Sequence, residues 1–298
     1  MNFSEELEVR TRGTEEIIRD FLPPEEGRQR VVMEAMNYSV LAGGKRLRPL
    51  IMYETWKMFG GSTDTIRPFM AAIEMIHTYS LVHDDLPAMD NDEYRRGNLT
   101  THAKYGHALG ILAGDGLLNY AFETAAAAFK RGQDTEELMR TAKALQILGG
   151  KAGVHGMIGG QVVDVEAAGQ SIDEEKLLFI YELKTGALLE ASMMIGAVLA
   201  GASDEEIKIV EQIASDVGLA FQIRDDILDV TSTLEVLGKP TLSDERNEKT
   251  TYVTLKGLSR ASADVEKISE RALKRLASLP YENEFLTELI RSLVYREK

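Results

Sequence analysis

The stretch HTYSLVHDDLPAMDNDEYRRG, from His77 to Gly97, predicts a long helix that ends in a dense group of charged side chains. The helix, expected over residues 64–84, follows from the helical spacing of apolar residues and from the absence of a breaker before Pro87. Acids crowded this closely repel one another unless a cation neutralises them. The group comprises Asp84, Asp85, Asp90, Asp92 and Glu93. Because oxygen ligands without cysteine suit hard ions, it indicates a Mg²⁺ or Mn²⁺ site.

Two arginines, Arg95 and Arg96, close this stretch and add a second kind of ligand-binding group. Their fork-shaped guanidinium groups match phosphate oxygens, so carboxylates, metal and guanidinium together indicate a bound diphosphate. Asp84 and Asp90 would point apart on a straight helix. We therefore expect Pro87 to end or kink the helix and Asp90 to fold back. The alternative for an isolated acidic run is a solvated helix end.

A second acidic cluster, FQIRDDILD from Phe221 to Asp229, argues against that alternative. Asp225 and Asp229 are four residues apart and share one helix face, with Gln222 on the same stripe and Asp226 beside it. Apolar residues between them mark a core-forming helix. Acids on one stripe of such a helix are expected to line a polar cavity.

Composition limits the class of protein. The net charge is −14, from 34 basic and 48 acidic residues, which argues against nucleic acid or an anionic membrane surface as a partner. Apolar residues make up 44% of the chain without a linker-like tract, so we expect one domain over residues 1–298. The chain has no cysteine for a disulfide. Its start is unlike a signal peptide and no run of about 18 apolar residues occurs, which predicts a cytoplasmic protein without a membrane span.

Nearly every long segment has helical spacing and no alternating strand pattern is found, which predicts an all-α bundle around a central cavity. A polar stretch at 233–248 is expected to be a mobile loop. Besides 64–84, the predicted helices span residues 4–20, 27–42, 48–59, 107–130, 135–149, 154–168, 173–200, 204–232, 250–278 and 280–296.

In these motifs the chain resembles the all-helical trans-isoprenyl diphosphate synthases of the short-chain bacterial kind. DDLPAMD resembles the first aspartate-rich motif of that family, with four residues between the pair and the third Asp, and DDILD resembles the second. Further matching motifs follow in family order: GGKRLRP (Gly43–Pro49), RRG (Arg95–Gly97), AGDGLL (Ala113–Leu118), GGQVVD (Gly159–Asp164), KTG (Lys184–Gly186), GK (Gly238–Lys239) and KTTY (Lys249–Tyr252).

The resemblance implies head-to-tail prenyl transfer in a homodimer. An allylic diphosphate ionises, the alkene of isopentenyl diphosphate attacks the carbocation, and a proton is lost. Mg²⁺, three ions per site with Mn²⁺ as a substitute, would act as Lewis acid on the leaving diphosphate. The implied metal ligands are Asp84, Asp85, Asp90, Asp225 and Asp229. The allylic diphosphate would be held by Arg95, Lys184 and Lys239, with Lys249 as a further candidate.

Isopentenyl diphosphate needs a basic pocket of its own. GGKRLRP supplies Lys45, Arg46 and Arg48 at a helix start, where the helix dipole also favours anions. His77 lies seven positions before Asp84, on the same helix face. The resemblance assigns this substrate to Lys45, Arg48, His77 and Arg96.

The remaining polar groups take supporting roles in the resemblance. Thr185 and Gln222 would steady the carbocation or the diphosphate, which is itself the implied proton acceptor. Gln161 and Asp164 would support the metal site. Asp115 and His102 are expected to be structural.

Product length is implied by the residues four and five positions before the first Asp, Ser80 and Tyr79. On an ideal helix Ser80 lies beneath Asp84 and Tyr79 about 100° round from Ser80. A tyrosine there would block elongation beyond the fifteen-carbon farnesyl chain. If Tyr79 packs in the core instead, Met75 or Phe122 would gate the pocket and geranylgeranyl diphosphate is the alternative product.

Two other functions are weighed against prenyl transfer. A terpene cyclase shares the helical cavity and an acidic Mg²⁺ motif. It uses only one diphosphate, however, and so would not need the basic pocket of Lys45, Arg48, His77 and Arg96. A non-catalytic partner subunit loses acidic motifs or basic groups, whereas both motifs and every expected Lys and Arg are present here.

Overall fold

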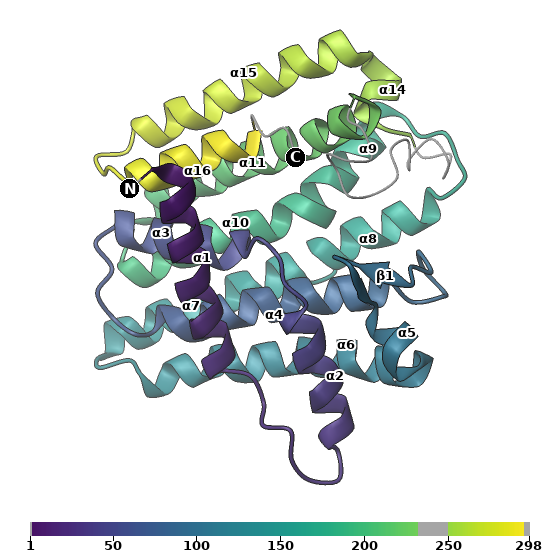
Figure 1. The fold of residues 1–298 in the computed structure, drawn as a ribbon. Coiled ribbons are helices and arrows are strands. Elements are labelled where there is room, and N and C mark those ends of the chain that lie inside the picture. The colour runs from purple at the N-terminus through teal and green to yellow at the C-terminus, as the bar shows by residue number, and fades with distance from the viewer. Residues whose placement is uncertain (1, 232–249, 295–298) are drawn as a thin grey trace.

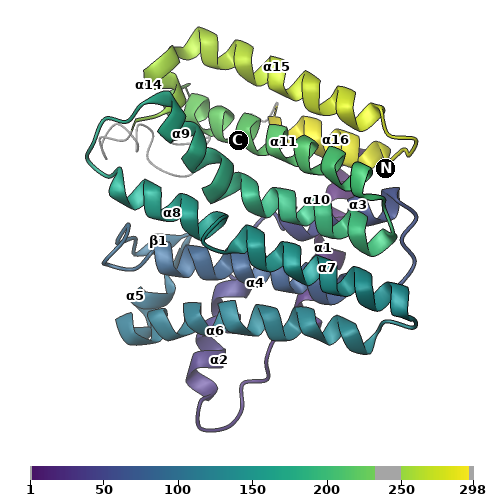
Figure 2. The same ribbon diagram turned by 180° about the vertical axis from the view of Figure 1, so that it is seen from behind.

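The central helix of the molecule is α4, Ile66–Asp84, which is buried along most of its length. The computed structural model describes residues 2–231 and 250–294. In Figure 1 the other long helices lie in layers above and below α4, and α1 and α2 cross one side of the molecule. Figure 2 shows α6, α7 and α8 on the opposite side. The prediction of an all-α fold is confirmed.

The predicted helices are found with small shifts at their ends, except that 250–278 is divided in two and that the short α5 was not predicted. The helices besides α4 are α1 Phe3–Asp20, α2 Arg30–Leu41, α3 Leu47–Met58, α5 Thr101–Tyr105, α6 His107–Ala126, α7 Thr135–Ala152, α8 Met157–Glu166, α9 Glu174–Ile180, α10 Ala187–Ala200, α11 Asp204–Thr231, α14 Tyr252–Lys256, α15 Leu258–Ala277 and α16 Glu284–Val294. A 3₁₀ turn, Ala127–Lys130, follows α6, and a π-helical turn, Tyr181–Gly186, joins α9 to α10.

Two sequence predictions are wrong in detail. Residues 250–278 do not form one helix, because Gly257 adopts φ +80° and separates α14 from α15. Strands were not expected, but β1 Tyr94–Arg95 pairs antiparallel with β2 Asn98–Leu99. The two-residue turn between them, Arg96 and Gly97, has φ of +54° and +78°. Positive φ at both central residues is typical of a type I′ turn, whose backbone twist matches that of the two flanking strands.

The main core lies where α4 meets α3, α6 and α10. Phe69, Ile73 and Ile76 of α4 are fully buried there, and each contributes about 1.5–3 kcal/mol by leaving water. A second cluster lies between α9, α11, α14 and α15. Only Glu174–Ala200, among the described residues, is long and apolar enough to cross a membrane by composition, but 78% of that window is buried as in a core helix.

Candidate active site

The C-terminal half of α4 carries residues of three predicted roles on neighbouring stripes. His77, Ser80 and Asp84 follow one another at intervals of three and four residues, and Tyr79 lies on the adjacent stripe. The helix ends at Asp84, and the chain then turns so that the Asp90 N–H donates to the Asp84 carbonyl at 2.9 Å. The predicted return of Asp90 toward Asp84 is confirmed.

Asp84 is held in a site that penalises its charge. Burial, together with the charges of Asp90 and Asp85, raises the pKa of Asp84 to about 6, although Lys184 acts in the opposite direction. Its Oδ1 accepts a hydrogen bond from the Gln161 amide at 2.8 Å. A divalent cation would remove the repulsion between these carboxylates, so the donor set fits Mg²⁺.

The metal site is not a closed protein cage. Among residues 2–231 and 250–294, no three His, Cys, Asp or Glu side chains are arranged to hold a metal ion by themselves. Mg²⁺ is ordinarily bound by one or two carboxylates together with water and substrate phosphates. The arrangement therefore fits a cation that arrives with a diphosphate.

The β1–β2 hairpin directs the two adjacent arginines to different neighbours. Arg95 grips buried Asp85 with Nε and Nη2, at 2.8 and 2.6 Å from Oδ1. Arg96 donates instead to the carbonyl of Gly43, in the basic loop before α3. A Cβ on Gly44 would lie 2.6 Å from the Arg96 guanidinium, so the second glycine of GGKRLRP leaves the space that Arg96 occupies.

The basic loop and the start of α3 contain both buried and exposed positively charged side chains. Arg46 is 3% exposed, has φ +50° at the start of α3, and is paired with Glu74 of α4 at 2.7 Å. Arg48, the second residue of α3, has a buried Nε without a hydrogen-bond partner, and burial lowers its pKa to about 10. Such an unpaired donor is costly unless a ligand supplies an acceptor. Lys45 is exposed at the same loop.

His77 faces this basic group. Burial, then the positive charges of Arg48 and Arg96, hold its pKa well below the usual 6.5, so the ring is neutral. A neutral imidazole can donate one hydrogen bond to an anion without adding repulsion to the arginines. The structure places Arg48 and Arg96 close enough to His77 for their charges to act on it, at one end of the α4 stripe.

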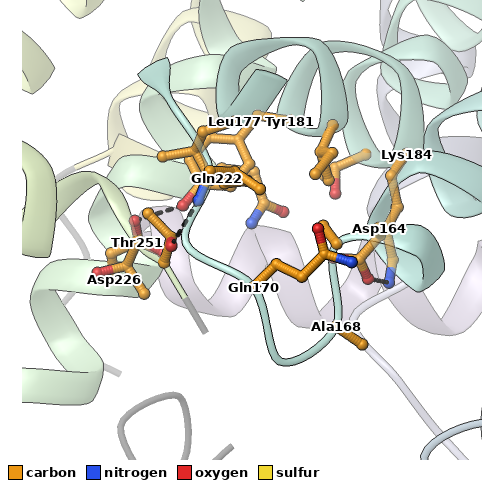
Figure 3. Close-up of a pocket in the computed structure, with 14 residues that line it drawn as sticks. Asp164, Ala168, Gln170, Leu177, Tyr181, Lys184, Gln222, Asp226 and Thr251 are labelled. Atoms are coloured by element: carbon orange, nitrogen blue, oxygen red, sulfur yellow. Dashed lines mark hydrogen bonds and ion pairs between the residues drawn. The ribbon is translucent and has the colours of Figure 1, made fainter. Parts of the chain in front are cut away.

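Lys184 and Thr185 lie on the π-helical turn between α9 and α10. Such turns re-aim side chains and are frequent at functional sites. Lys184 pairs with Asp164 of α8 at 2.6 Å. Its pKa is raised by Asp164 and Asp84, although burial opposes the shift. Figure 3 shows Gln222 of α11 pointing into the same opening as Lys184.

The acids of DDILD divide into two groups on α11. Asp226 is buried and accepts from the Tyr181 hydroxyl at 2.5 Å and from the Tyr252 N–H at 2.7 Å, so it holds α11, the π-turn and α14 together. Asp225 and Asp229 lie on the neighbouring stripe, half-buried and buried respectively. Lys239, Lys249 and the predicted loop at 233–248 lie outside the described residues.

One cavity is lined by several of the predicted residues from α3, α4, α8 and the π-helical turn. It has a volume of about 670 Å³ and an apolar wall from α6 and α8 that includes Leu118, Met157 and Ile158. The predicted residues among those lining it are Arg48, His77, Tyr79, Ser80, Asp84, Gln161, Lys184 and Thr185. Met75 and Phe122, the alternative gates, are not among the described residues that line it. Asp85 faces Arg95 and Arg96 in a smaller pocket.

Sequence reasoning missed several residues that build the site. Glu74 interrupts the apolar run AAIEMI, a signal for a buried ion pair. Tyr181 gave no such signal, because its partner Asp226 lies 45 positions away. The pairing of Arg95 with Asp85 was also missed, since the hairpin was not predicted.

The fold and the site define an all-α protein in which an acidic and a basic group of side chains lie beside one apolar cavity. The model of the family described as Polyprenyl synthetase matches residues 29–288. The chain belongs to this family and is a trans-prenyltransferase.

Named relatives agree with the family. The chain is 47% identical over 84% of its length to a dimethylallyltranstransferase of Fischerella ambigua, covering 70% of that protein. It is 38% identical to the farnesyl diphosphate synthase of Escherichia coli, over 100% of both chains. A structure of a Helicobacter pylori geranyltransferase, complexed with magnesium and isoprenyl diphosphate, is similar with a TM-score of 0.83 and 32% identity, over 99% of this chain and 97% of that one.

Proposed function

We propose that the chain condenses isopentenyl diphosphate with dimethylallyl diphosphate and then with geranyl diphosphate, and that farnesyl diphosphate is its main product. The observation that carries this proposal is the single cavity that Arg48, His77, Asp84 and Tyr79 line together. A cyclase would need no Arg48–His77 end, and a non-catalytic subunit would not keep both charged ends.

Each end of the cavity has a defined task in this reaction. Arg48, His77 and Arg96, with Lys45, bind isopentenyl diphosphate without metal. Lys184 and Arg95 hold the allylic diphosphate, with Lys239 and Lys249 as further candidates. Thr185 and Gln222 steady the carbocation. The walls exclude water from it, since carbocations are captured rapidly by solvent.

Mg²⁺ supplies Lewis-acid stabilisation of the leaving diphosphate. Asp84, Asp85 and Asp90 would hold it from the end of α4 and the turn that follows, and Asp225 and Asp229 from α11. Support comes from the donor set described above and from the magnesium named with the Helicobacter pylori relative. We propose three ions per site, with Mn²⁺ as a substitute.

The proposed chain-length floor is Tyr79, with Ser80 beside it. Tyr79 is 5% exposed and borders the cavity. Geranylgeranyl diphosphate is the alternative product, because relatives named for it are 42–43% identical to the chain.

The deciding experiment sizes the products. Purified protein is incubated with Mg²⁺, labelled isopentenyl diphosphate and dimethylallyl diphosphate, and the dephosphorylated prenols are separated by length. Mainly farnesol supports condensation and the Tyr79 floor together. Mainly geranylgeraniol keeps the reaction and refutes the floor, and no prenol refutes the proposed function.

We further propose that the protein is a cytoplasmic homodimer. Large apolar side chains are exposed on α6 and α7 and just before α8, among them Leu112, Met139 and Val154. Exposed large apolar side chains on neighbouring helices are a feature of protein interfaces. Light scattering after size-exclusion chromatography tests the dimer.

A further inference from the structure

His83, one residue before the first acidic motif, has a prepared place that the proposed reaction does not explain. Its ring lies against Gly114 of α6, where a Cβ would come within 2.0 Å of Nε2 and 2.2 Å of Cδ2. α4 and α6 run alongside each other in both views of the molecule. The space that Gly114 leaves is therefore filled by the imidazole, which accounts for the first glycine of AGDGLL.

Polar contacts fix the orientation of this ring. Nε2 lies 3.1 Å from the carbonyl oxygen of Ile111, so Nε2 must carry a proton and donate it. Asp115 Oδ1 lies 3.8 Å from the same nitrogen, on the exposed side. A ring held by a carbonyl, a carboxylate and a fitted slot has little rotational freedom.

The other side of the ring meets Tyr79, one turn earlier on α4. Their ring centroids are 5.8 Å apart and the planes cross at 82°, an edge-to-face contact. Both residues line the cavity beside Asp84. His83 thus contacts the proposed floor of the prenyl pocket and directly precedes the proposed metal ligand Asp84 on α4.

We propose that His83, which fills the space left by Gly114, is a positioning residue. It holds the Tyr79 ring in place as the floor of the prenyl pocket and so limits the length of the product. The inference rests on the proposed function. A side chain at position 114 would expel the imidazole from its slot, and Tyr79 would lose its edge-to-face partner. The displaced state of Tyr79 becomes about fivefold more populated, the factor that loss of such a contact produces, and elongation beyond farnesyl rises in proportion.

The test compares product ratios at equal turnover for Gly114→Ala, His83→Gln and His83→Phe. We expect about a fivefold rise in the ratio of geranylgeraniol to farnesol for Gly114→Ala and for His83→Gln, which lacks an aromatic ring. His83→Phe keeps a ring against Tyr79 and is expected to stay near the wild-type ratio. A role of His83 through Asp84 alone would lower the rate of all three without changing the ratio.

Gly116→Ala is the matched control, because its Cβ would meet only the flexible Met36 side chain of α2 at 2.8 Å. Tyr79→Ala is the positive control for the floor. An unchanged ratio in both Gly114→Ala and His83→Gln, while Tyr79→Ala lengthens the product, refutes this inference and leaves the proposed function intact. If Gly114→Ala does not fold, His83→Gln decides alone. Absence of any prenol from the wild-type protein refutes the proposed function as well.

Discussion

Removal of the negative charge of Glu74 is expected to destabilise the protein more than its small change in shape suggests. Glu74 and Arg46 have side chains that are 3% and 2% exposed, and their atoms are 2.7 Å apart. Breaking a buried ion pair by changing one partner costs about 3–5 kcal/mol, because the other charge stays buried. Arg46 keeps Glu15 at 3.2 Å and the Val40 carbonyl at 2.7 Å. We therefore expect Glu74→Gln to cost about 3 kcal/mol, the lower end of that range.

Glu15→Gln provides the matched control, since it removes a charge from the same arginine. Glu15 is 31% exposed, and screened pairs of this kind contribute less than about 1 kcal/mol. Free energies of unfolding are measured by urea denaturation followed by circular dichroism. The reasoning would be contradicted if the two variants lost equal amounts of unfolding free energy, or if Glu74→Gln lost less than about 1 kcal/mol. Because Arg46 starts α3 beside Lys45 and Arg48, we also expect the KM for isopentenyl diphosphate to rise more than that for geranyl diphosphate.

The remaining predictions concern the charged groups of the cavity. Asp84→Ala and Asp225→Ala are each expected to lower turnover at least about a thousandfold with the circular dichroism spectrum unchanged; near-normal rates would refute the metal assignment. Arg48→Gln should raise the KM for isopentenyl diphosphate by about tenfold or more, since the charge-assisted hydrogen bonds are lost, and an unchanged KM would remove Arg48 from the site. Arg95→Lys cannot reproduce the two-pronged contact with Asp85, so kcat should fall by about tenfold. EDTA should abolish turnover and excess Mg²⁺ should restore it; turnover that persists in EDTA would contradict the proposed metal dependence.

The helices were predictable because their signals are local. Apolar residues recur at helical spacing through 64–84 and 204–232, and the structure has α4 and α11 within two residues of those bounds. The acidic residues of both motifs could likewise be placed on faces by counting. Helical spacing alone was therefore enough to predict that His77, Ser80 and Asp84 lie on one face of the helix.

Contacts between distant elements could not be obtained in this way. Asp226 resembles a metal ligand by position, but its partners Tyr181 and Tyr252 come from two other elements. The π-turn at Tyr181–Gly186 closes i→i+5 hydrogen bonds, and such turns are too rare to be expected from a helical pattern of apolar residues. The hairpin was missed because two-residue strands are too short to show an alternating pattern.

One end of the cavity has unfavourable positive charge and the other has unfavourable negative charge, and α4 separates the two ends. At one end Arg48 has an unpartnered buried donor and His77 is held neutral. At the other, burial and like charges raise the pKa of Asp84 to about 6. Seven residues of helix separate His77 from Asp84, about 10 Å at 1.5 Å per residue. An anion relieves the first cost and a cation the second, so a metal-free diphosphate and a metal-bound one are each favoured at only one end. In the proposed reaction, this buried helix therefore determines which substrate binds at which end of the cavity.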